Sequence, residues 1–127
     1  MFLLADEGYP GYAAMTLAPD RLLAEAPDAV RAFNQASRAG WISYLNGDPA
    51  PGDALIRRAN PDMRPDVLAQ AREKMKAFNI VGAPDAVGAM THDRWAEFFR
   101  VASGQGVYPA DLDVRRAYTL DVLPSPA

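Results

Sequence analysis

The sequence predicts a mainly α-helical fold with five to six helices and one to three short strands. Two observations lead to this prediction. Apolar residues recur at spacings of three and four in several segments, and no regular alternation of strands and helices is visible that would build a parallel sheet. The chain of 127 residues, 50% of them hydrophobic, is long enough for one core. We therefore expect a single domain over residues 1–127, with the short strands in residues 1–17 and a helical part at 18–127.

The N-terminal segment predicts two of the short strands. Phe2 to Ala5 is apolar and stops at an acidic pair, and Ala13 to Leu17 is apolar and stops just before Pro19. The segment DEGYPGY between them contains two glycines and a proline, so the chain must turn there.

The helical part begins with a short helix over Asp20–Ala26, with Leu22 and Leu23 inward. The longest helix begins at Pro27, whose missing N–H suits a first helical turn, and stops at Asn46-Gly47. Its residues divide into two predicted faces. The buried stripe is Val30, Phe33, Ser37, Trp41 and Tyr44 or Leu45, and the solvated side holds Arg31, Asn34, Gln35 and Arg38.

Three further helical segments follow a joint at Asp48 to Asp53. One is a short helix around Leu55 and Ile56, and one opens at Pro65. After a loop at 81–90, Thr91 is placed to cap the last of them. The buried face of this helix is predicted to be Trp95, Phe98, Phe99 and Ala102, with Gly104 as its C-cap glycine and a helical turn and extended tail beyond it.

Composition excludes several classes of protein. The formal net charge of -3 argues against a strongly basic nucleic-acid binder and offers no polybasic patch for a membrane. The absence of cysteine excludes disulfide scaffolds, thiol nucleophiles and thiolate metal sites. No stretch has the length of a membrane span, so we expect no membrane insertion. The start has no secretory signal, which predicts a cytoplasmic chain if it is expressed as written.

Residues for catalysis are scarce. The single histidine, His92, stands beside Asp93 at a predicted helix start, where the helix dipole disfavours the imidazolium form. With no second histidine to complete a metal site, we interpret it as an exposed structural residue. The sequence therefore predicts no catalytic residue, no metal site and no cofactor, and a protein that is not an enzyme.

The candidate ligand-binding residues are Asp6, Tyr9 and Tyr12, in the segment DEGYPGY. Tyrosines in a turn offer flat apolar area and a hydroxyl, and a carboxylate accepts hydrogen bonds from a ligand. The competing interpretation is a glycine-containing turn whose tyrosines pack on a neighbouring helix.

The pattern Asp6-x-Gly8-x-Pro10-x-Tyr12, a short apolar segment and the helix phrase PDAVRAFNQASRAGW come in sequence. Together they resemble the C-terminal part of ABC-transporter substrate-binding proteins of the nitrate/sulfonate/taurine and thiamine-pyrimidine-synthase-like family. The break at Asn60-Pro61, the aromatic phrase DRWAEFF and the segment Tyr118 to Pro124 are similar too. The resemblance covers nearly the whole chain, but only about the last two-fifths of a typical member.

This resemblance implies part of a periplasmic-binding-protein type II lobe, with residues 1–17 as the crossing strands that join two lobes. It also implies a periplasmic location and an ABC permease as partner. It implies a solute-binding module, or a C-terminal fragment of one. Such a module holds a small organic ligand, such as a pyrimidine precursor, a sulfonate or a related anion, without catalysis. Because a cleft needs two walls, we expect a homo-oligomer or a missing N-terminal lobe to complete it. The alternative is a truncated helical domain that has lost its cleft and acts in protein interaction or self-association.

Overall fold

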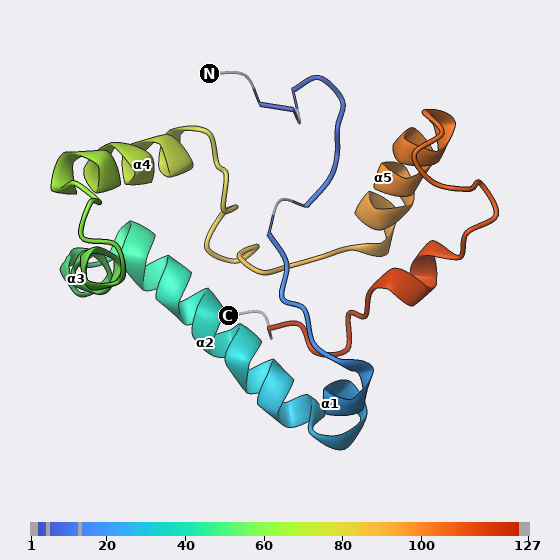
Figure 1. Ribbon diagram of the computed structural model, residues 1–127, viewed down its shortest axis with the longest axis horizontal. Coiled ribbons are helices and arrows are strands. Elements are labelled where there is room, and N and C mark those ends of the chain that lie inside the picture. Colours follow the sequence, from blue (N-terminus) through green and yellow to red (C-terminus); the bar gives the residue numbers. More distant parts are fainter. Residues whose placement is uncertain (1–2, 5, 13, 125–127) are drawn as a thin grey trace. The chain divides into compact units, whose positions relative to one another are not determined.

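The computed structural model of the protein describes residues 3–4, 6–12 and 14–124, and every regular element in these ranges is helical (Figure 1). The mainly α prediction is confirmed. The elements in chain order are α1 (Asp20–Glu25), α2 (Pro27–Asn46), α3 (Ala50–Ala59), α4 (Pro65–Ala77), α5 (His92–Gly104) and the 3-10 helix η1 (Val114–Ala117).

No strand occurs in the described ranges, so the predicted strands are not confirmed. Phe2, Ala5 and Ala13 lie outside the described residues. Leu3 and Leu4 instead form a turn, in which their carbonyls accept hydrogen bonds from the backbone N–H groups of Asp6 and Tyr9, each at 3.0 Å. A short apolar segment becomes a strand only beside another strand, and the described part of the chain offers none.

The chain divides into two compact units, and the boundary falls inside α2. The first unit comprises residues 1–30 and 89–123, and the second comprises residues 31–88 and 124–127. The assignment of residues 1–127 to a single domain stays a prediction.

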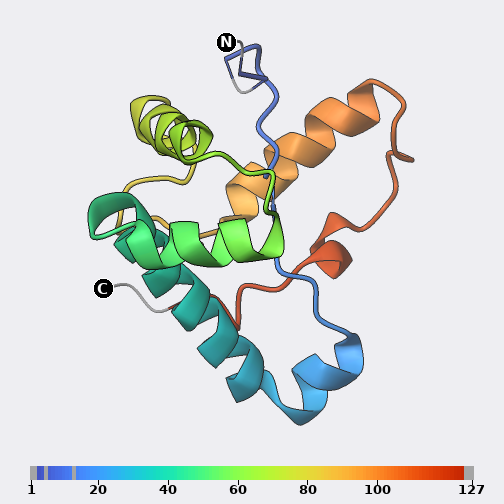
Figure 2. The same cartoon turned by 60° about the vertical axis from the view of Figure 1, so that its left-hand side comes forward.

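In the second unit, α3 begins earlier than the sequence predicted, and Figure 2 shows it leaving the end of α2 through a short turn. Pro51 falls in the first turn of α3, where its missing N–H leaves no hydrogen bond unmade. Gly52 follows, and a Cβ there would stand 2.7 Å from the ring of Tyr44. The predicted joint at Asp48–Asp53 is therefore partly helix, with a glycine that lets α3 approach the Tyr44 ring.

The longest helix is confirmed, and its predicted buried stripe is correct at Val30 and Leu45 but wrong at Phe33 and Trp41. Phe33 and Trp41 are 59% and 41% exposed, whereas Arg38, predicted to be solvated, is only 5% exposed. The guanidinium of Arg38 donates a hydrogen bond to the carbonyl of Pro84 at 3.1 Å. A charged residue is buried only where its donors find acceptors, and Pro84 supplies one here. The buried residues of α2 are therefore two apolar side chains and one arginine, while Phe33 and Trp41 remain exposed.

In the first unit, α5 begins where the sequence predicted. The hydroxyl of Thr91 accepts the backbone N–H of Arg94 at 3.2 Å, as a helix N-cap does, and Trp95 and Ala102 are buried. The C-terminal end differs from the prediction. Gly104 is the last helical residue, and Gly106, at φ 74, takes the left-handed conformation. Its N–H donates to the carbonyl of Ser103 at 2.9 Å.

Because Gly106 is left-handed and Gly104 is helical, substitutions at the two positions should have different effects on stability. Gly106→Ala should destabilise the protein by about 1 kcal/mol or more, because a Cβ strains the left-handed conformation. Gly104→Ala should be neutral or slightly stabilising, since nothing lies within 4 Å of a Cβ there. Urea unfolding monitored by circular dichroism measures both. Equal effects of the two substitutions would contradict the assignment.

Candidate functional site

The first unit contains a cluster of aromatic side chains around one face of α5. Trp95 is at its centre: the ring of Tyr118 stacks on it with centroids 4.6 Å apart and planes at 2°, and Tyr12 lies 5.7 Å away. Phe98 meets both Trp95 and Tyr9 edge to face, at 6.2 Å and 5.6 Å. We call this group the α5 aromatic cluster, and it comprises Tyr9, Tyr12, Trp95, Phe98, Tyr108 and Tyr118.

Arg94 holds the segment that carries the two N-terminal tyrosines against α5. Its Nε donates to the carbonyl of Pro10 at 2.8 Å, and its NH2 group donates to the carbonyl of Gly11 at 3.0 Å. The guanidinium carbon also lies 4.5 Å from the centroid of the Tyr12 ring, within the range of a cation–π interaction. The Tyr12 hydroxyl accepts the backbone N–H of Thr91 at 2.9 Å. These contacts attach residues 10–12 to the start of α5.

Two polar groups, His92 beside the cluster and Trp95 within it, have contrasting surroundings. His92 shares a hydrogen bond between its Nδ1 and the Tyr118 hydroxyl, at 2.7 Å. The indole Nε1 of Trp95 is buried and has no hydrogen-bond partner among the described residues. A buried donor without an acceptor costs about 1–3 kcal/mol, so an acceptor brought to this N–H would be bound favourably.

The structure brings together two of the three predicted ligand-binding residues. Tyr9 and Tyr12 lie in the α5 aromatic cluster and pack on that helix, as the competing interpretation expected. Asp6 is exposed, in the turn that precedes them. Whether these three residues bind a ligand stays a prediction. Sequence reasoning missed Arg94 and Tyr118, because their contacts with Pro10 and Trp95 join segments far apart in the chain and leave no periodic signal.

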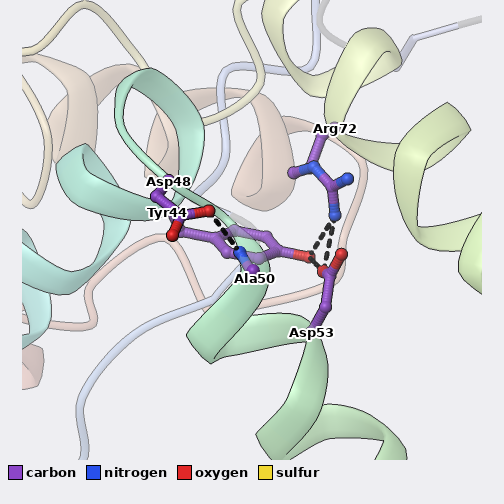
Figure 3. Close-up of polar contacts among 5 residues, drawn as sticks. All are labelled: Tyr44, Asp48, Ala50, Asp53 and Arg72. Carbon is purple, nitrogen blue, oxygen red and sulfur yellow. Dashed lines mark hydrogen bonds and ion pairs between the residues drawn. The ribbon is translucent and has the colours of Figure 1, made fainter.

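The second unit is joined by a polar contact of three helices (Figure 3). The Tyr44 hydroxyl of α2 donates to Oδ1 of Asp53 on α3 at 2.8 Å, and Arg72 of α4 donates to the same oxygen at 2.5 Å. Arg72 also donates to the Tyr44 hydroxyl at 3.1 Å. The Arg72 and Asp53 side chains are only 16% and 23% exposed, so water screens this ion pair less than an exposed one.

Asp48 supports the same corner of the second unit. Its Oδ1 accepts the backbone N–H of Ala50 at 2.9 Å, where α3 begins (Figure 3). This bond satisfies one of the N–H groups that a helix start leaves without a partner in the helix. In the contact of Tyr44, Asp53 and Arg72, the Asp53 carboxylate and the Arg72 guanidinium neutralise each other. We therefore interpret this contact as structural.

The environment of Tyr44 shifts its acidity. Burial, and then the hydrogen bond to the Asp53 carboxylate, raise the pKa of the Tyr44 hydroxyl above its ordinary value of 10.0, although Arg72 acts in the opposite direction. Both causes disfavour a phenolate beside a carboxylate. Tyr44 therefore acts as a neutral donor.

The most exposed aromatic surface of the second unit lies on α2. We define the outward face of α2 as Phe33, Ala36, Gly40 and Trp41, all exposed. The Trp41 ring lies at a steep angle to the ring of Tyr44, with 6.4 Å between their centroids. This face has no charged group and no catalytic chemistry, so what it offers is apolar contact area.

The chemistry available in the described ranges is that of contact and hydrogen bonding. No group of three or more histidine, cysteine or acidic side chains in these ranges is arranged to hold a metal ion. Among the helices of the described residues, none combines the length and the apolar character needed to cross a membrane. No protein-family model, no curated protein and no solved structure matches the chain.

The Tyr44 contact predicts a pH dependence. Because the fold raises the Tyr44 pKa, its stabilisation is complete below pH 10 and is lost as pH rises through the higher folded-state pKa. Tyr44→Phe should cost about 1 kcal/mol near neutral pH through the lost hydrogen bond. Its free energy of unfolding should then fall less steeply above pH 10 than that of the wild type. Urea titrations at a series of pH values measure this, and parallel curves for the two proteins would contradict it.

Proposed function

We propose that the chain is a helical interaction module that associates with itself through exposed apolar helix surfaces. The observation that carries this proposal is that more large hydrophobic residues are exposed than hydrophobic residues are buried. Seven hydrophobic residues of the described ranges are buried, whereas fourteen large hydrophobic residues are exposed. Large exposed apolar surface is typical of sites where proteins bind one another.

The second unit supplies much of this surface. On α2, Phe33 and Trp41 are exposed, and the neighbouring helices add Leu55, which is 57% exposed, and Val67, which is 45% exposed. Covering apolar area stabilises an assembly by about 25 cal/mol per Å². A partner surface that covers these side chains therefore gains free energy that the described monomer leaves unused.

The α5 aromatic cluster fits this proposal better than it fits an open ligand site. Tyr9 and Tyr12 pack on Phe98 and Trp95, and the Tyr12 hydroxyl already accepts the Thr91 N–H. These side chains therefore contribute to holding the first unit together. Their surfaces toward α5 are not available for a stacked ligand.

One observation favours a second candidate function, the solute-binding module that the family resemblance implies. Trp95 Nε1 is a buried donor with no acceptor among the described residues, and it lies beside Tyr12. An anionic or heterocyclic ligand with an acceptor oxygen or nitrogen would satisfy it. In that case the chain holds a ligand without catalysis, and an ABC permease is its partner.

Thermal melting separates the two candidates. Self-association predicts that the melting temperature falls on hundredfold dilution, because the bound state is favoured by concentration. It also predicts no shift with aromatic heterocycles, sulfonates or nitrate. A ligand at 100 times its dissociation constant would raise the free energy of unfolding by about 2.7 kcal/mol. A ligand-dependent shift that is the same at every protein concentration would contradict the first proposal and support the second.

A further inference from the structure

Asn46 differs from the other asparagines of the chain in the residue that follows it. Asparagine is a thermolabile side chain, because the backbone nitrogen of the next residue can attack its amide carbon and expel ammonia. Glycine shields this nitrogen least, since it has no Cβ, and Asn46 is followed by Gly47. Both residues are exposed, so water reaches the peptide group between them.

The other three asparagines have no such neighbour. Asn60 precedes Pro61, whose nitrogen carries no hydrogen to lose and cannot act as this nucleophile. Asn79 precedes Ile80, whose branched side chain crowds the nitrogen, and the Ile80 N–H donates to a carbonyl of α4 at 2.9 Å. Asn34 lies inside the 20 residues of α2, where the helix holds the backbone N–H groups.

A hydrogen bond holds the Gly47 nitrogen at the end of α2. The Gly47 N–H donates to the carbonyl of Ser43 at 2.8 Å, which continues the helical hydrogen-bond pattern by one residue. In this state the nitrogen is engaged, and the helical backbone at Asn46 turns it away from the amide carbon. The ends of a helix open more readily than its interior, so the nitrogen is released whenever this bond breaks.

We propose that Asn46 is a self-modification site, at which Gly47 displaces ammonia from the side chain and water completes the conversion to aspartate and isoaspartate. Base removes the Gly47 N–H proton, the nitrogen forms a bond to Cγ of Asn46, and the amide nitrogen leaves as ammonia with a proton from solvent. Water then opens the cyclic imide at either of its carbonyl carbons. Water is the only co-reactant, so the reaction needs no second copy and goes beyond the proposed self-association.

The products act on the corner where α2 passes into α3 (Figure 3). Either product places a carboxylate at the C-terminal end of α2, where the helix dipole is negative, and two residues before the carboxylate of Asp48. Isoaspartate also adds a methylene group to the backbone, which shifts Asp48 relative to the Ala50 N–H that it accepts. The same corner holds the hydrogen bond of Tyr44 to Asp53. The modification therefore loosens the contact between α2 and α3.

Peptide mapping of the full chain after incubation in mildly alkaline buffer tests the site. Trypsin places each of the four asparagines in a different peptide, so mass spectrometry follows them separately. Asn46 should be converted at least about tenfold faster than any other asparagine, and both aspartate and isoaspartate should form. Conversion of another asparagine at an equal rate overturns the site. Aspartate without isoaspartate overturns the attack by Gly47.

Asn46→Gln is the matched control. It keeps an exposed amide at this position, but its longer side chain requires a larger ring for attack by Gly47, so its peptide should stay unconverted. Gly47→Ala is less suitable, because a Cβ there would stand 2.8 Å from the Ser43 carbonyl oxygen and would itself disturb the helix end.

Urea tests the control by the helix end. Unfolding breaks the bond between Gly47 and Ser43, so conversion of Asn46 should be about fivefold faster or more in the unfolded chain. Equal rates in the folded and unfolded chains overturn the protection by this bond.

The Asn46→Asp chain tests the consequence, because it supplies the charge without the reaction. Its melting temperature should be lower than that of Asn46→Gln, and that of aged wild-type chain, which also contains isoaspartate, should be lower still. Equal melting temperatures of the three proteins overturn the effect on the corner of α2 and α3.

Discussion

The hydrogen bond of the buried Arg38 guanidinium to the Pro84 carbonyl ties the middle of α2 to the loop after α4, and the account of the second unit depends on it. A guanidinium withdrawn from water needs acceptors, and the loop after α4 provides one. Arg38 is buried on α2 together with Val30 and Leu45, whereas Phe33 is 59% exposed and Trp41, less than one turn after Arg38, is 41% exposed. The same helix thus buries a charge that has an acceptor and leaves two large aromatic side chains exposed.

A second polar contact gives the same unit its internal order. Tyr44, Asp53 and Arg72 come from three successive helices and share one carboxylate oxygen and one hydroxyl. In a unit with few buried apolar side chains, such contacts supply positional specificity rather than large net stability. The first unit is held differently, by stacked and edge-to-face rings around Trp95 and by the donors of Arg94.

The sequence predicted local features well, because their causes lie within a few residues. Pro27 and Pro65 mark helix starts, Asn46-Gly47 marks a stop, and the Thr91 cap is formed as expected. Spacing predicted the burial of Val30 and Leu45 in α2, but not that of Arg38. Adjacent rows of a helix are separated by one residue, and the acceptor that draws Arg38 inward is 46 residues away. Likewise, packing of Tyr9 and Tyr12 on a helix was foreseen as an alternative, but the helix in question, α5, was not identified.

The fluorescence of Trp41 as a function of protein concentration tests the central claim most directly. In a Trp95→Phe chain it is the only tryptophan and reports on the outward face of α2. The account predicts solvent-exposed, red-shifted emission in dilute protein, and a blue shift with reduced acrylamide quenching as the chains associate. Blue-shifted, shielded emission from a dilute monomer would contradict it, because the chain would then cover this face by itself.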